Sequence, residues 1–215
     1  SVQEGLALPP SMVAPLGVTS LVVRAYTAAP IAGPYFVVLG TIEGRKNHLL
    51  LLRIWRRLIE RMGDASPKLV IIGQRGWCAE EVFKQLNHDL TLRSHVIEVG
   101  PCDDDMLSAY LAHARALLFP TFVEGQGLPL TEALGAGVPA IASNLAVFKE
   151  TAGDIPDYLD PKDDAGWEQA VLDYTQPDSA RRAAQIQRMQ GFAPPTWEAH
   201  FAKVDAWLME QGLLP

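Results

Sequence analysis

The sequence has few cysteines and no long hydrophobic run. Cys78 and Cys102 are its only cysteines, and they do not form a C-x-x-C pair. This number and spacing favour two reduced thiols in a cytosolic protein over a disulfide or a metal site. No apolar run approaches the ~20 residues that a membrane-spanning helix requires. The first residues also do not show the charged and apolar regions of a signal peptide.

Basic residues are in the minority. Eighteen lysines and arginines stand against 25 aspartates and glutamates, which gives a formal net charge of −7. A global basic field is therefore absent, and we do not expect nucleic acid as a partner. The five histidines show no metal-ligand spacing, and we assign none of them a role. Any anion site must be built locally, from loop amides and a few cations.

Hydrophobic residues make up 48% of the 215 residues, enough to bury one full core in a single domain. Short β-branched apolar runs alternate with longer segments of helical periodicity, which is typical of β-α-β units. We therefore predict an α/β fold, a doubly wound parallel sheet of about six strands with helices on both faces. The expected strands are 35–40, 68–73, 96–99, 116–119, 138–142 and 157–159, and the expected helices are 47–62, 78–92, 104–114, 130–136, 145–152, 163–175, 178–191 and 196–211.

The most informative segment runs from 120 to 139, where a short glycine-rich loop separates an apolar run from a helical segment. Such a loop at a helix start offers backbone N–H groups and the positive end of a dipole to a phosphate. Glu124 and Glu132 flank the loop, with seven residues between them. Carboxylates disfavour a nearby phosphate, so we expect them to accept hydrogen bonds from hydroxyls on either side of it. A nucleotide sugar carries hydroxyls on both sides of a diphosphate.

This segment closely resembles the nucleotide-sugar signature of the glycosyl transferases group 1, the family 4 retaining glycosyltransferases with two Rossmann-like domains (the GT-B fold). The signature reads P-S-x-x-E-G-F-G-L-P-x-x-E-A-x-A-x-G-x-P-V-I-A-S, and the chain keeps nearly all of it through Ser143. It departs at Gln126, where the family usually has an aromatic residue. The resemblance implies that Glu124 contacts hydroxyls of the transferred sugar and that Glu132 holds the nucleotide ribose.

By the same resemblance, the loop amides would approach the diphosphate, and the small glycines of the loop permit this. The backbone near Val99 would lie beside the nucleotide base. For Arg75, a surface position in a turn is the alternative interpretation. The expected donor-binding residues are Gly40, Thr41, Arg75, Val99, Gly125, Gln126, Gly127, Leu128 and Glu132.

Two adjacent cations, Arg45 and Lys46, follow the first expected strand. Lysine supplies a compact point charge and arginine a planar fork, and both suit phosphate oxygens. A solvated pair at an ordinary helix start, capped by Asn47, is the alternative. The family has an arginine directly after this strand and a lysine five residues later. Lys46 matches that lysine, whereas Thr41 stands at the arginine position, so Arg45 would take over its role.

We therefore predict Arg45, Lys46 and Glu124 as the catalytic residues. The two cations would stabilise the charge that develops on a departing nucleoside diphosphate. If they neutralise this charge, no metal ion or other cofactor is required.

Two patterns suggest other chemistries. Glu124 and Glu132 resemble a hydrolase acid/base pair, but Glu132 falls in the first turns of a helix whose dipole stabilises a carboxylate. The three aspartates at 103–105 resemble the D-x-D metal motif of another glycosyltransferase fold. An apolar helical pattern follows them, so we interpret Asp103 as a helix cap, followed by acidic first-turn residues.

The ends of the chain differ from its centre. A phrase at 13–18 resembles the end of the connection out of the family's N-terminal domain, and residues 192–198 resemble the start of the family's last helix. The resemblance implies the C-terminal half of a longer enzyme. Residues 1–34 would be an interdomain linker, 35–195 a nucleotide-sugar-binding Rossmann-like domain, and 196–215 a helix that crosses back to the missing N-terminal domain.

The resemblance implies transfer of a hexosyl group, with retention, from a nucleoside-diphosphate sugar to a glycan or lipid-linked acceptor in polysaccharide biosynthesis. The acceptor would bind through the missing N-terminal domain. The R-K-N pattern at 45–47 resembles that of mannosyltransferases, which weakly favours GDP-mannose and leaves UDP-sugars open. We expect a cytoplasmic protein, and peripheral contact with the inner face of the membrane stays open because relatives often act on lipid-linked acceptors.

Three alternatives stay open. A nucleotide-sugar epimerase of the same fold is less compatible with the full E-x7-E signature. A glycan phosphorylase would need a cofactor lysine in a setting that we do not find. A nucleotide-sugar binding module, inactive as an isolated fragment, is the third.

Overall fold

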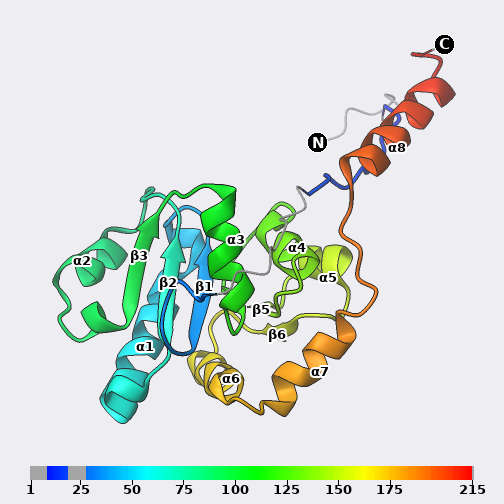
Figure 1. The fold of residues 1–215 in the computed structure, drawn as a ribbon. Coiled ribbons are helices and arrows are strands. Elements are labelled where there is room, and N and C mark those ends of the chain that lie inside the picture. The colour runs from blue at the N-terminus through cyan, green and yellow to red at the C-terminus, as the bar shows by residue number, and fades with distance from the viewer. Residues whose placement is uncertain (1–8, 19–27, 215) are drawn as a thin grey trace. The chain divides into compact units, whose positions relative to one another are not determined.

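The computed structural model describes residues 9–18 and 28–214, and Figure 1 shows its fold. The described residues fall into two compact units. Residues 9–18 and 193–214 form one unit, and residues 28–192 form the other. The larger unit contains the sheet and every candidate site residue.

The larger unit is built on a six-stranded sheet in which every pairing is parallel. The strand order is β3-β2-β1-β4-β5-β6, so the chain first builds outward from β1 on one side and then returns to build outward from β4 on the other. This confirms the predicted doubly wound α/β fold. The strands are β1 (Tyr35–Leu39), β2 (Lys68–Ile72), β3 (Val96–Gly100), β4 (Leu117–Phe119), β5 (Ala140–Ser143) and β6 (Asp157–Leu159).

Helices cover both faces of this sheet (Figure 1). Residues of α1, α2 and α6 share one hydrophobic cluster with one side of the strands, and residues of α3, α4 and α5 share a second cluster with the other side. The helices are α1 (His48–Met62), α2 (Glu80–His88), α3 (Asp104–His113), α4 (Leu128–Gly135), α5 (Ala146–Ala152), α6 (Asp164–Thr175), α7 (Ala180–Arg188) and α8 (Trp197–Glu210), with 3-10 turns η1 (Gly44–Lys46), η2 (Gly63–Ala65) and η3 (Leu92–Ser94).

The first strand shows why the sequence gives a two-faced sheet. All five residues of β1 are buried. Because side chains alternate along a strand, Phe36 and Val38 pack into the cluster below α1, while Val37 and Leu39 pack into the cluster below α4. A continuous apolar run is therefore needed here, as expected of a buried parallel strand.

Helix α2 is shorter than the predicted 78–92. Cys78 has a φ of 53°, in the left-handed region, so the helix cannot include it and begins at Glu80. At the other end Asp89 is extended, and η3 completes the connection to β3. The interpretation of Asp103 is confirmed, since its carboxylate accepts a 2.8 Å hydrogen bond from the Met106 backbone N–H at the start of α3.

The smaller unit joins the two ends of the chain. The backbone N–H of Val18 donates to the carbonyl of Pro195 over 2.9 Å, and the ring Nδ1 of His200 lies 2.9 Å from the carbonyl of Pro15. A Cβ at Gly17 would lie 2.3 Å from the backbone nitrogen of Trp197, so only glycine fits against the start of α8. The segments at 13–18 and 192–198 that resemble the two interdomain connections thus meet within one unit, apart from Phe192 itself.

Candidate functional site

The site lies where the winding of the sheet reverses. Strands β1 and β4 are neighbours, but the helices that follow them cover opposite faces of the sheet. Beyond the carboxyl edge, the chain therefore turns to one face after β1 and to the other face after β4. Open α/β sheets bind ligands in the crevice formed at such a switch point. The two loops contact each other through the Arg45 carbonyl, which accepts hydrogen bonds from the Phe122 backbone N–H at 2.8 Å and the Thr121 hydroxyl at 3.0 Å.

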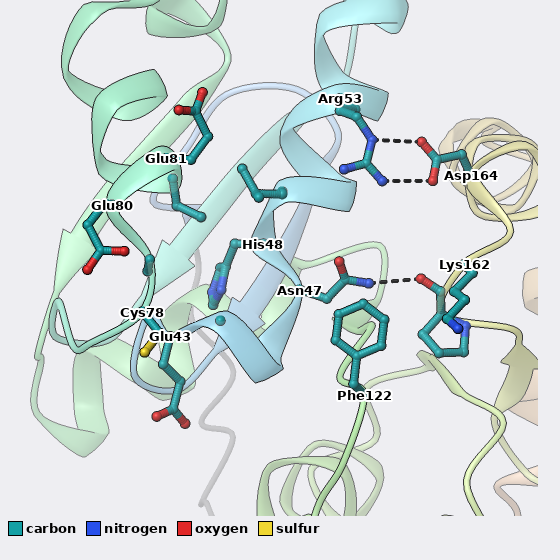
Figure 2. A pocket seen from close by; sticks show the side chains of 15 residues that line it. Glu43, Asn47, His48, Arg53, Cys78, Glu80, Glu81, Phe122, Lys162 and Asp164 are labelled. Atoms are coloured by element: carbon teal, nitrogen blue, oxygen red, sulfur yellow. Dashed lines mark hydrogen bonds and ion pairs between the residues drawn. The ribbon is translucent and has the colours of Figure 1, made fainter.

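Asn47 fastens these loops together. Its side-chain amide donates to the carbonyl of Pro120 over 3.1 Å and to that of Pro161 over 2.9 Å, and Figure 2 draws the second of these bonds. The residue precedes α1 but makes no side-chain capping bond, and its φ of 58° is left-handed, a conformation that asparagine tolerates better than most residues. Asn47 is therefore a connector between loops and not the cap that the alternative interpretation proposed.

Arg45, Lys46 and Glu124 come together in one ionic cluster. The Lys46 ammonium lies 2.6 Å from Oε1 of Glu124, and Nη1 of Arg45 lies 3.0 Å from the same oxygen. Nη2 of Arg45 lies 2.6 Å from Glu43, so the cluster contains two cations and two carboxylates. The Lys46 and Glu124 side chains are each 9% exposed, whereas that of Arg45 is 42% exposed. Arg45 is thus the cation that an incoming anion reaches most easily.

A pair of stacked aromatic rings supports this cluster. The rings of Phe119 and Phe148 lie 5.2 Å apart at 22°, and the Lys46 ammonium lies 4.9 Å from the centre of the Phe119 ring. Gly127 rests on the same pair, since a Cβ there would lie 2.4 Å from Cε1 of Phe148. The aromatic pair therefore contacts both the lysine and the glycine-rich loop and limits how far each can move toward the sheet.

The loop at 125–128 leads directly into α4. Gly127 stands at the N-cap with a left-handed φ of 80°, and no side chain caps the helix. Pro129 has no N–H, and the N–H of Leu130 donates to the Gly127 carbonyl over 2.9 Å, so the candidate donors for an anion here are the backbone N–H groups of residues 125–128. A Cβ at Gly125 would meet no atom within 4 Å, so space is open beside its backbone. Gln126 and Leu128 are half-buried at this helix start.

Glu132 is half-buried further along α4. Among the described residues its carboxylate has no hydrogen-bond or ion-pair partner. Burial, and then the like charge of Asp104, raise the pKa of the Glu132 carboxyl above its usual value. Within the described residues, the Glu132 carboxyl is therefore available to accept a hydrogen bond.

Gly40 and Thr41 lie at the base of the site. Gly40 ends the β1 segment with a φ of 117°, and a Cβ there would lie 3.7 Å from the Lys46 ammonium. The methyl of Thr41 lies against Gly76, where a Cβ would approach it to 2.5 Å. Gly40 therefore faces the ionic cluster, while Thr41 contacts the loop after β2.

Arg75 and Val99 lie by the neighbouring strands β2 and β3. The guanidinium of Arg75 forms two hydrogen bonds of 2.7 Å with the Glu98 carboxylate and one of 2.8 Å with Asn87. This pairing with Glu98 raises the pKa of Arg75 above its usual value. Val99 is half-buried against the second hydrophobic cluster. Neither residue contacts the Arg45–Glu124 cluster, so their expected donor contacts stay predictions.

Sequence reasoning missed two residues that build this site. Glu43 is buried and holds the guanidinium of Arg45; its place two residues before the cations was the only signal. Phe148 lies in α5, 21 residues after Gly127, and nothing in the sequence connects it with the loop. The described residues contain no group of three or more histidine, cysteine or acidic side chains that could hold a metal ion. No helix in the described ranges has the length and apolar character needed to cross a membrane.

Comparison with known proteins finds relatives among mannosyltransferases. The chain is 33% identical over 164 residues to the O-antigen chain mannosyltransferase B of Escherichia coli, covering 76% of this chain and 42% of that protein. It is 35% identical over 129 residues to the serotype-specific mannosyltransferase WbdA of Escherichia coli, covering 60% of this chain and 16% of WbdA. The chain thus spans less than half the length of these curated relatives.

Solved structures show the same fold at low identity. WaaG, a glycosyltransferase involved in lipopolysaccharide biosynthesis, matches with a TM-score of 0.70 and 19% identity over 91% of this chain and 55% of WaaG. The C-terminal domain of the group 1 family protein LpcC from Francisella tularensis matches with a TM-score of 0.61 and 19% identity, covering 81% of this chain and 88% of that domain. The family model described as glycosyl transferases group 1 matches residues 25–175. This chain therefore belongs to the glycosyl transferases group 1.

Proposed function

We propose that this chain is the donor-binding half of a retaining glycosyltransferase, which transfers a hexosyl group from a nucleoside-diphosphate sugar to a glycan or lipid-linked acceptor. One observation carries the proposal. Arg45 and Lys46 meet on a single oxygen of Glu124, beside an uncapped, glycine-rich helix start. Cations and the backbone N–H groups of a glycine-rich loop at a sheet switch point suit a diphosphate.

The proposed chemistry is mainly electrostatic. When the bond between the anomeric carbon and the diphosphate breaks, its electron pair goes to a phosphate oxygen, and negative charge develops there. Arg45, Lys46 and the amides of residues 125–128 would stabilise this charge. Since the two cations are already balanced by Glu43 and Glu124, the diphosphate must share them with these carboxylates. We propose that no metal ion is needed, and the test is transfer that survives a chelator.

Glu124 and Glu132 would bind the two hydroxyl-bearing ends of the donor. The Oε2 atom of Glu124 has no partner among the described residues, so it can accept a hydrogen bond from the transferred sugar. Glu132 would accept one from the ribose, because it is half-buried and has no cationic partner among the residues that the structure describes. Both roles rest on the resemblance stated above together with these contacts.

The mannosyl group and GDP are the preferred donor components. This preference is supported by the R-K-N pattern at 45–47 and by the mannosyltransferase names of the relatives. Retention rests on family membership. The acceptor would bind through the remainder of a longer protein, in the cytoplasm or at the inner face of the membrane.

Calorimetry with GDP, UDP and ADP tests the donor site most directly. We expect heat from at least one nucleotide, with GDP the strongest. We expect no sugar transfer by this chain alone, because the proposed acceptor binding depends on the remainder of a longer protein. The full-length protein should transfer. If none of the three nucleotides gives heat, the donor site is wrongly assigned. If the full-length protein binds donor but transfers nothing, the chain belongs to a binding module.

A further inference from the structure

A pocket opens beside the proposed donor site, on the α1 and α2 side of the switch point (Figure 2). It lies where the first turns of α1 and α2 meet η1, Phe122 and the loop from β6 to α6. Its volume is about 430 Å³, within the range of ~300–1,000 Å³ that small-ligand sites occupy. The pocket is therefore sized for a molecule and not for a single ion.

Two helices begin at the wall of this pocket. Helix α1 begins after Asn47 and helix α2 after Ala79, and neither of these residues caps its helix with a side chain. Both residues line the pocket. The first N–H groups of each helix consequently lack side-chain acceptors.

A buried histidine is the strongest sign of a ligand. His48 lines the pocket and is 2% exposed, yet neither of its ring nitrogens has a hydrogen-bond partner. In Figure 2 its ring points from the start of α1 toward the side of the pocket where Cys78 and Glu43 lie. Burial, and then the charge of Lys46, lower the pKa of His48 to about 4, so the ring is neutral and offers one donor and one acceptor. Unpaired buried polar groups are costly and call for a partner.

The charges around the pocket are mixed. Glu43 is paired with Arg45, and Asp164 with Arg53, while Glu80 and Lys162 also line the wall. This balance suits neither a strong anion nor a metal ion, and the described residues hold no metal-binding group. A neutral ligand with several hydroxyls would satisfy the donors, the carboxylates and the imidazole together.

An aromatic side chain completes the lining. Phe122 is 43% exposed, and its backbone N–H bonds the Arg45 carbonyl, so it belongs to the donor loops as well as to this pocket. An exposed aromatic face beside hydrogen-bonding groups suits a ligand with both apolar and polar surfaces, such as a sugar ring.

We propose that this pocket binds a sugar ring of the acceptor, held by His48, Glu80 and the first amides of α1 and α2. The proposal rests on the glycosyltransferase function proposed above. It adds that the donor-binding half itself provides an acceptor subsite. Pocket and cation cluster share Glu43, so an acceptor bound here would lie next to the donor.

Amide NMR of this chain, titrated with methyl α-mannobioside, tests the subsite. We expect shifts at His48, Leu49 and Glu80, and saturable binding. His48→Leu should weaken this binding by about tenfold or more, a loss of at least ~1.4 kcal/mol, without lowering the melting temperature, because it removes an unpaired buried polar group. Glu80→Ala, on the surface, should weaken binding in a chain that folds normally. Glu60→Ala, on the exposed side of α1, is the matched control and should change nothing.

The possible results separate this proposal from the donor assignment. If GDP binds but the disaccharide shifts none of these amides, the subsite is wrong and the donor site stands. The subsite is equally wrong if inorganic phosphate shifts the amides and the sugar does not, or if His48→Leu binds the sugar as well as the unchanged chain. Absence of GDP binding would overturn the donor site, whatever the disaccharide does.

Discussion

The two ends of the glycine-rich segment carry the same side chain in opposite electrostatic settings. Glu124 lies within hydrogen-bond distance of both Arg45 and Lys46. Glu132 has no cationic partner in the described part of the chain, and burial and Asp104 raise its pKa. One carboxylate thus has two cationic partners, whereas the other has none among the described residues.

This difference indicates a division of labour along one ligand. Two cations lie beside Glu124, and a diphosphate could bind them as well. Glu132 has no cationic neighbour within residues 9–18 and 28–214, so a neutral hydroxyl is the better partner there. The comparison yields four predictions, which run from the largest expected effect to the smallest.

Removing the buried cation should have the largest effect. Lys46→Ala should weaken GDP binding by about 100- to 1,000-fold, because removing one partner of a buried, hydrogen-bonded charge pair costs ~2–5 kcal/mol of binding free energy. It should leave guanosine binding nearly unchanged. Lys46→Met should do the same, since it keeps the contact with Phe119 and loses only the charge. Lys84→Ala, at an exposed site on α2, is the control. Equal weakening of GDP and guanosine would show that Lys46 does not contact the diphosphate.

The two loop glycines should separate stability from binding. Gly127→Ala forces a Cβ against Phe148 at a left-handed φ, so we expect a loss of about 2–4 kcal/mol and a melting temperature lower by roughly 5–15 °C. In Gly125→Ala the added Cβ meets no atom within 4 Å, so the melting temperature should stay unchanged while GDP binding becomes weaker. Thermal unfolding and calorimetry measure the two effects. A Gly125→Ala chain that binds GDP normally would mean that the diphosphate does not approach this amide.

Neutralising Glu124 should strengthen nucleotide binding. In Glu124→Gln both cations lose a competing anion, so GDP should bind about five- to tenfold more tightly, a gain of roughly 1 kcal/mol. Sugar transfer by the full-length protein should nevertheless fall, because the contact with the transferred sugar is weakened. Weaker GDP binding in this variant would indicate that Glu124 positions the cations more than it competes for them.

Neutralising Glu132 should have a smaller effect, of a different kind. Its raised pKa means that the folded state favours the protonated carboxyl. The corresponding stability is present at low pH and is lost as pH rises through the raised value. Glu132→Gln should therefore raise the melting temperature at neutral pH and leave it unchanged at acidic pH. The same variant should bind both guanosine and GDP more weakly. The exposed Glu60→Gln is the control; a gain that does not depend on pH would rule out the carboxyl charge as its cause.

Much of the fold could be predicted because its signals are local. The apolar runs and helical periods placed the six strands and eight helices within a few residues. The contact between the Arg45–Lys46 segment and the Glu124 loop also followed, because the carboxyl ends of neighbouring parallel strands share an edge. The limits of α2 were less accurate, since the left-handed Cys78 leaves no signal in the apolar pattern.

The rest of the site depends on contacts across long sequence separations. The stacking of Phe119 on Phe148 and the pairing of Arg75 with Glu98 are set by tertiary packing. His48 was assigned no role because a histidine in a helical pattern gives no sign of whether its nitrogens find partners. Only the structure shows that they do not.

The double hydrogen bond of Asn47 has a consequence for ligand communication. The side-chain amide of Asn47 donates to the carbonyl of Pro120, at the start of the Glu124 loop, and to that of Pro161, which lines the pocket at the starts of α1 and α2. A ligand that moves one of these two carbonyls also moves the Asn47 amide and so alters its hydrogen bond to the other carbonyl. Occupancy of one site should then alter the affinity of its neighbour, and thermodynamic reciprocity makes that influence equal in both directions.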